Sequence, residues 1–143
     1  MAVEKVHVLG INPVQQMIIR LALTEAFRRQ AETLLIEAHN NPSKIHEHLE
    51  MLSYQLEHYE TTSAGLPAPI NMKNAKTKLV YLSGSAMRYL TDAINTFEPA
   101  SADVDEDFVK SVERAFPKVK SLVNTSAMFD YTADDIRRAN LDD

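Results

Sequence analysis

The chain has 143 residues, a length that predicts one domain because two domains usually need about 200 residues or more. Hydrophobic residues make up 45% and charged residues 24%, which is typical of globular proteins and excludes intrinsic disorder. The absence of cysteine excludes disulfides, thiolate metal sites and cysteine nucleophiles. With three glycines and no glycine-rich loop, the chain can form neither a Walker phosphate loop nor a dinucleotide-binding fingerprint.

The net charge of −5 disfavours a general nucleic-acid-binding role, because duplex-binding domains normally carry a basic stripe. No stretch approaches the 18 apolar residues of a membrane span, and the first residues do not form a signal peptide. We therefore expect a cytoplasmic protein with no membrane partner, or a virion component if the chain belongs to a phage.

The first predicted helix covers residues 13–39. Asn12 is a good N-cap residue, and Pro13 suits the first helical position because its missing N–H costs nothing there. Apolar residues then recur at helical spacing, among them Ile19, Leu23 and Phe27. Residues 17–23 are apolar apart from one arginine, which predicts burial on more than one side of this helix.

The second predicted helix covers residues 42–60 and again follows an Asn–Pro pair. Its apolar residues alternate at spacings of three and four, which suits packing in an antiparallel bundle: Ile45, Leu49, Leu52, Leu56 and Tyr59. The glycine and two prolines of residues 65–69 end this helix.

Two further main helices are predicted over residues 74–97 and 102–128, with Ser83-Gly84-Ser85 in the middle of the first. A short C-terminal helix is predicted over 133–141, where Thr132 and Asp135 resemble a capping box. Within residues 1–11, the segment 3–9 could form a short strand or an extended arm, and an N-terminal arm over 1–11 is favoured because no partner strand is visible. The predicted fold class is all-α, an antiparallel bundle of four main helices with a short C-terminal helix and an N-terminal arm, in a single domain 1–143.

Histidines around the second helix suggest a metal or ligand site. His46 and Glu50 are four residues apart and share a helix face, and His58 lies further along the same helix. Di-metal bundles need Glu-x-x-His motifs on two helices, and the predicted helices contain none. Solvated histidines are therefore the favoured interpretation, with a metal- or ligand-binding bundle as the alternative.

Three lysines at the start of the third predicted helix, Lys73, Lys76 and Lys78, form a candidate anion-binding site. They could bind phosphate or a nucleic-acid backbone, which would make the protein a nucleic-acid-binding accessory factor. The favoured interpretation is structural. Glu57 and Glu60 would pair with Lys76 and Lys78 across a helical hairpin and offset unfavourable helix dipoles.

Catalytic motifs are missing from the sequence. It contains no Gly-x-Ser-x-Gly elbow, and no acidic residue interrupts an apolar stripe as a buried acid–base pair would. We therefore assign no catalytic residues, expect no cofactor, and predict a non-enzymatic protein.

The favoured function is that of a structural or interaction protein, a small helical subunit within a larger assembly such as a bacteriophage particle or a bacterial complex. The apolar surface exceeds what one stripe per helix requires, and such an excess usually marks a partner surface. The expected partners are copies of the same chain or other protein subunits. The predicted interface consists of Val6, Val8, Leu9, Ile11, Met17, Ile18 and Leu21.

Overall fold

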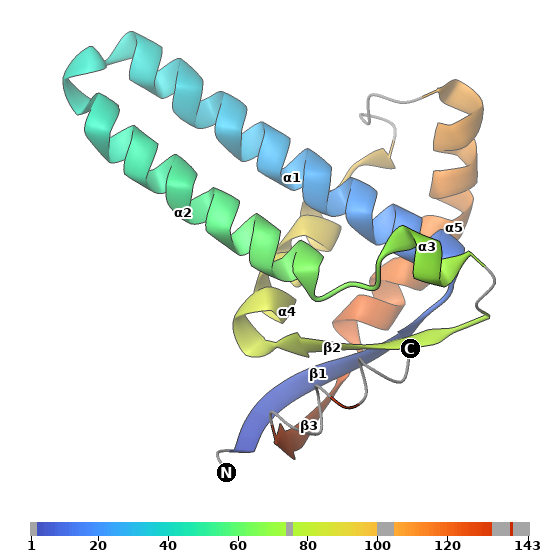
Figure 1. The fold of residues 1–143 in the computed structure, drawn as a ribbon. Coiled ribbons are helices and arrows are strands. Elements are labelled where there is room, and N and C mark those ends of the chain that lie inside the picture. The colour runs from blue at the N-terminus through green and yellow to red at the C-terminus, as the bar shows by residue number, and fades with distance from the viewer. Residues whose placement is uncertain (1–2, 74–75, 100–104, 133–137, 139–143) are drawn as a thin grey trace.

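The computed structural model describes residues 3–73, 76–99, 105–132 and 138. Its elements follow in chain order: β1 (Val3–Ile11), α1 (Pro13–Asn40), a short 3-10 helix (Pro42–Lys44), α2 (Ile45–Ala64), α3 (Pro69–Met72), β2 (Lys78–Ser83), α4 (Gly84–Thr96), α5 (Glu106–Asn124) and β3 (Ala127–Thr132). The helices lie on one side of the sheet, and α1 and α2 form a long hairpin that projects away from it (Figure 1).

The predicted all-α class is wrong, because the chain forms a three-stranded antiparallel sheet in the order β2-β1-β3. The predicted N-terminal arm is its central strand. Val6 of β1 pairs with Ser83 of β2 on one side and with Phe129 of β3 on the other. Both partners lie far along the chain, so a search for a neighbouring strand could not find them.

The predicted helix 74–97 is in fact a strand followed by a helix. Val80 and Leu82 are buried and Leu79 is exposed, as expected of a strand with one face on the core. Ser83 then caps α4 by accepting a hydrogen bond from the Ala86 N–H at 3.2 Å. The Ser-Gly-Ser segment is therefore a strand-to-helix junction and not the middle of a helix.

The predicted helix 102–128 is also too long. The helix α5 covers Glu106–Asn124, and the residues after it turn back to form β3 beside β1. Thr132, predicted to cap a C-terminal helix, is the last residue of β3. The predicted helix 133–141 lies outside the described residues apart from residue 138.

The start of α1 is fixed by a reciprocal cap. The Asn12 side chain accepts from the Gln15 N–H at 2.8 Å, and the Gln15 side chain accepts from the Asn12 N–H at 3.0 Å. The first half of α1 packs with the sheet, α4 and α5 around one core. Its largest fully buried apolar side chains are Leu9, Ile11, Ile19, Leu23, Leu82, Leu90, Ile94, Val80, Val119 and Val123.

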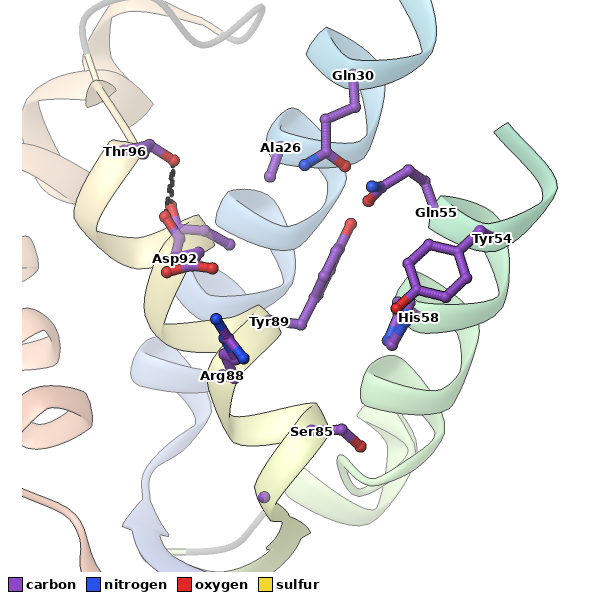
Figure 2. Close-up of a pocket in the computed structure, with 12 residues that line it drawn as sticks. Ala26, Gln30, Tyr54, Gln55, His58, Ser85, Arg88, Tyr89, Asp92 and Thr96 are labelled. Atoms are coloured by element: carbon purple, nitrogen blue, oxygen red, sulfur yellow. Dashed lines mark hydrogen bonds between the residues drawn. The ribbon is translucent and has the colours of Figure 1, made fainter. Parts of the chain in front are cut away.

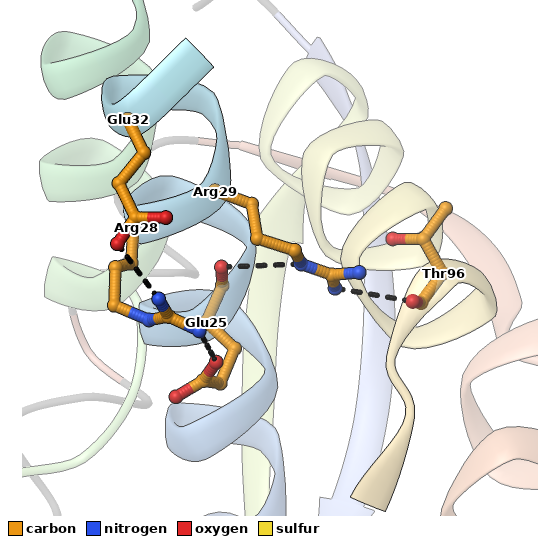
Figure 3. A network of polar contacts seen from close by, with 5 residues as sticks. All are labelled: Glu25, Arg28, Arg29, Glu32 and Thr96. Atoms are coloured by element: carbon orange, nitrogen blue, oxygen red, sulfur yellow. Dashed lines mark hydrogen bonds and ion pairs between the residues drawn. The ribbon is translucent and has the colours of Figure 1, made fainter. Parts of the chain in front are cut away.

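Two arginines tie other elements to α1. Arg20 donates to the Pro67 carbonyl at 2.7 Å and holds the segment after α2. Arg29 donates to the Thr96 carbonyl at 3.1 Å, at the C-terminal end of α4 (Figure 3). On the same helix, Arg28 bridges Glu25 at 2.7 Å and Glu32 at 2.8 Å. Of these contacts, the one from Arg29 ties the end of α4 to α1.

Candidate functional site

The predicted interface falls largely within the core of the chain itself. Val6, Leu9, Ile11 and Ile18 are each no more than 3% exposed, Val8 and Leu21 are half-buried, and Met17 is exposed. The apolar excess of this region has a simple reason, since β1 is a central strand and α1 is covered on more than one side. Of these side chains, the structure leaves mainly that of Met17 accessible to a partner.

The candidate metal ligands are separated along α2. His46 and Glu50 are exposed and lie one turn apart, whereas His58 is half-buried. His58 lies about 18 Å from His46 along the helix axis, at about 1.5 Å per residue. Among the described residues, no three histidine, aspartate or glutamate side chains gather closely enough to hold a metal ion.

The three candidate anion-binding lysines lie between α3 and the edge strand. Lys73 follows α3, Lys76 lies in the connection, and Lys78 is the first residue of β2. The pairing predicted for Lys76 and Lys78 with Glu57 and Glu60 assumed two neighbouring helices. That premise is wrong, because Lys78 belongs to a strand.

The hairpin is held together by a seam of alternating contacts. The half-buried residues of its outer part recur every three or four positions on both helices: Phe27, Ala31, Leu34 and Ala38 on α1, and His48, Leu52, Gln55 and Tyr59 on α2. The rings of Phe27 and Tyr59 stack with centroids 5.1 Å apart, and His48 lies 3.4 Å from Glu37. These pairs align the two helices in antiparallel register.

One side of the hairpin faces α4. Residues three positions after the seam residues, such as Gln30, Met51 and His58, line hollows on this side. The opposite side carries residues three positions before the seam residues. Four of these are large and apolar, and we call them the hairpin stripe: Leu35 of α1 and Ile45, Leu49 and Leu56 of α2.

The hairpin stripe is largely accessible to solvent. Leu35 is 56% exposed, Ile45 43%, Leu49 50% and Leu56 40%. The sequence predicts the three α2 residues as part of an internal packing seam. In the structure, the α2 residues that contact α1 lie about 60° around the helix axis from the seam predicted by the sequence. This is the angle between two residues three positions apart in a helix. The hairpin stripe is therefore an apolar surface without cover among the described residues.

A cleft of about 730 Å³ lies on the other side of the hairpin, between α1, α2 and α4 (Figure 2). Figure 2 shows the Tyr89 ring rising from α4 between Gln30 of α1 and Gln55 of α2. Arg88 and Asp92 line its α4 side. A second hollow of about 360 Å³ shares Tyr54, His58 and Ser85 with the cleft and extends it along α2.

Aromatic rings form the middle of the cleft. The ring of His58 packs edge-on against Tyr54 at 4.3 Å and lies nearly parallel to Tyr89 at 6.2 Å. The Tyr89 hydroxyl is buried and has no hydrogen-bond partner among the described residues. Burial raises the pKa of Tyr89, and Tyr59 adds to the effect, so this hydroxyl stays a protonated donor at neutral pH.

Sequence reasoning selected His58 but missed Tyr54 and Tyr89. Tyr54 lies on the same side of α2 as His58, four residues earlier, so its spacing carries a signal. Tyr89 comes from α4, and no sequence pattern relates it to α2. Its position depends on how β2 places α4 beside the hairpin.

Comparisons of the chain with protein-family models, with curated proteins and with solved structures give no match. None of the helices in the described part of the chain combines the length and the hydropathy needed to cross a bilayer.

Proposed function

We propose that this protein is a non-enzymatic interaction subunit that assembles with other protein subunits through the hairpin stripe. The observation that carries the proposal is the exposure of Leu35, Ile45, Leu49 and Leu56 on one side of a projecting hairpin. Single exposed apolar residues are common on soluble proteins, whereas a contiguous set typically marks a contact surface.

The expected strength of the contact follows from the apolar surface that it buries. Burying a leucine or isoleucine side chain completely is worth about 1.5–3 kcal/mol. The four stripe residues are about half exposed, so covering them contributes roughly 3–6 kcal/mol. Association costs about 4–15 kcal/mol in lost freedom of motion and ordering. We therefore expect an assembly whose mass depends on concentration, unless polar contacts at the border of the stripe add to it.

The test is absolute mass by light scattering after size exclusion, over a hundredfold range of concentration. We expect the wild-type mass to rise with concentration above 16.1 kDa and Leu49→Lys to stay monomeric. Ile36→Lys is the matched control, because Ile36 is 61% exposed but lies two positions from the seam residues Leu34 and Ala38, on the far side of α1. A monomeric wild type, or a Leu49→Lys variant that assembles normally, would contradict the proposal.

A second function, binding of a small molecule in the cleft, is favoured by the Tyr89 hydroxyl. A buried donor without an acceptor costs about 1–3 kcal/mol, which an acceptor on a ligand would offset. The rings of Tyr54 and His58 favour a flat ligand, and the volume of about 730 Å³ falls within the range of small-molecule sites.

Benzoate and benzamide are suitable probes for this second function because each joins a flat ring to an acceptor. We expect them to shift the side-chain amide NMR signals of Gln30 and Gln55, and Tyr89→Phe to weaken the effect. Acetate, an acceptor without a ring, is the control. Equal shifts with acetate, or unchanged binding in Tyr89→Phe, would count against a site built around this hydroxyl.

A further inference from the structure

The α4 wall of the cleft carries two oppositely charged side chains. Arg88 and Asp92 lie four residues apart, so they share one face of α4, and both line the cleft (Figure 2). Both are exposed, and neither side chain has a hydrogen-bond or ion-pair partner among the described residues. This wall therefore presents a cation and an anion to the cleft, one helical turn apart.

The two charges do not bridge each other, although their spacing permits it. On α1, Arg28 and Glu32 have the same spacing and the same order, and their side chains are paired at 2.8 Å. Asp92 is shorter than a glutamate by one methylene, and no ion pair joins it to Arg88. Both side chains therefore remain available to charged groups of a ligand.

The surrounding charges favour neither a simple anion nor a simple cation. Glu57 lines the second hollow, and Arg29 and Glu37 line a third hollow of about 320 Å³ further along the hairpin. Apart from His58, whose charge depends on pH, the three hollows thus present two bases, Arg29 and Arg88, and three acids, Glu37, Glu57 and Asp92. An anion alone would meet the excess of acids, and a cation alone would meet Arg88. A ligand that carries both charges fits the cleft best.

We propose that the cleft binds a free aromatic amino acid, with its carboxylate at Arg88, its ammonium group at Asp92 and its ring against Tyr54 and His58. The inference rests on the small-molecule function proposed above and names the class of ligand. A free amino acid carries both charges on one carbon, so a single small molecule can meet both side chains of the α4 wall. A longer peptide carries its two terminal charges at opposite ends and does not match this spacing.

The two walls of the cleft supply complementary contacts for such a ligand. An arginine binds a carboxylate through charge-assisted hydrogen bonds, which are stronger than neutral ones. The opposite wall carries the rings of Tyr54 and His58, packed edge-on at 4.3 Å, and aromatic rings pack favourably against a further ring. The charged end of the ligand would thus face α4 and its ring would face α2.

Calorimetry with L-phenylalanine and its blocked derivatives tests the need for both charges. N-acetyl-L-phenylalanine keeps the ring and the carboxylate, and L-phenylalaninamide keeps the ring and the ammonium group. We expect each derivative to bind roughly threefold to tenfold more weakly than L-phenylalanine, because each loses one partly solvated ionic contact. L-alanine keeps both charges but lacks the ring, and it should also bind more weakly.

Two variants assign the charges to their side chains. Arg88→Gln should weaken binding of L-phenylalanine roughly threefold to tenfold without weakening that of L-phenylalaninamide, which has no carboxylate to lose. Asp92→Asn should weaken L-phenylalanine by a similar factor without weakening the N-acetyl derivative. Arg114→Gln is the matched control, because Arg114 is exposed on α5 and does not line the cleft.

The outcomes separate this inference from the function on which it rests. L-phenylalanine that binds no more tightly than its blocked derivatives would overturn the amino-acid inference, even if benzamide binds and Tyr89→Phe weakens it. Equal losses for L-phenylalanine and L-phenylalaninamide in Arg88→Gln would overturn the placement of the carboxylate. No binding of benzoate, benzamide or L-phenylalanine at millimolar concentration would overturn both proposals for the cleft.

Discussion

Gly65 ends α2 at a point where space and not backbone conformation demands glycine. Its φ of −73° suits any residue, but an added Cβ would lie 2.6 Å from Cδ2 of Leu82, which is itself 1% exposed. We expect Gly65→Ala to lower the free energy of unfolding by about 1–3 kcal/mol through overpacking, measured by urea denaturation. Gly84→Ala is the control. Nothing lies within 4 Å of its added Cβ, so stability should be unchanged or higher by up to about 1 kcal/mol.

Tyr89 gives the stability of the protein a defined dependence on alkaline pH. Burial raises the pKa of Tyr89, so the folded chain holds this proton more tightly than the unfolded chain does. The free energy of unfolding should therefore decline as pH rises above about 10, the ordinary value for tyrosine. Tyr89→Phe should show a smaller decline and equal or greater stability at neutral pH, because the hydroxyl that it removes has no hydrogen-bond partner among the described residues. Identical pH profiles for the two proteins would refute this assignment.

At the scale of elements, β1 determines whether the sheet exists. It is the only strand that pairs with both others in the described part of the chain, and Ile11 at its end is fully buried. We expect Ile11→Ala to lower the free energy of unfolding by about 2–5 kcal/mol. Leu79→Ala on β2, where the side chain is 53% exposed, should change the free energy of unfolding by no more than about 0.5 kcal/mol.

Removal of residues 1–11 should abolish cooperative unfolding, and a truncated chain that still folds would contradict the central role of β1.

Elements defined by local chemistry could be predicted from the sequence, and elements defined by distant partners could not. Asn12 and Pro13 mark the start of α1, and the apolar residues that follow at helical spacing mark its body, so all the signals for α1 lie within α1 and its cap. The strand β2 gives no such local signal. Leu79, Leu82 and Ala86 keep helical spacing even though a strand-to-helix junction lies between them. Only pairing with β1, about 70 residues earlier, selects the strand.

At the scale of the whole molecule, the sequence indicated which faces are apolar but not what covers each of them. Residues of β1 were predicted as an interface and in fact line the core, whereas Leu49 and Leu56 were predicted to pack internally and are half exposed. Both errors have one physical cause. The periodicity of the sequence gives the direction in which a side chain points from its own helix or strand. Which other element packs over that side chain depends on how distant parts of the chain are arranged. The cleft was missed for the same reason, since Tyr89 meets His58 only through the placement of α4.

The outer half of the hairpin should respond to concentration in a way that reports on assembly. In one copy, residues 27–40 and 45–58 are supported mainly by each other, because the seam between them is only half-buried and the stripe beside it is exposed. Such a segment opens at lower free energy than the core, so we expect its amides to exchange hydrogen fastest among the long helices in dilute solution. If a second copy covers the stripe, their protection should rise with protein concentration, because binding to the folded form stabilises it by mass action. Hydrogen exchange read by mass spectrometry checks this directly. Leu49→Lys should show the same weak protection at every concentration, and a wild type that behaves identically would mean that the stripe stays uncovered in solution.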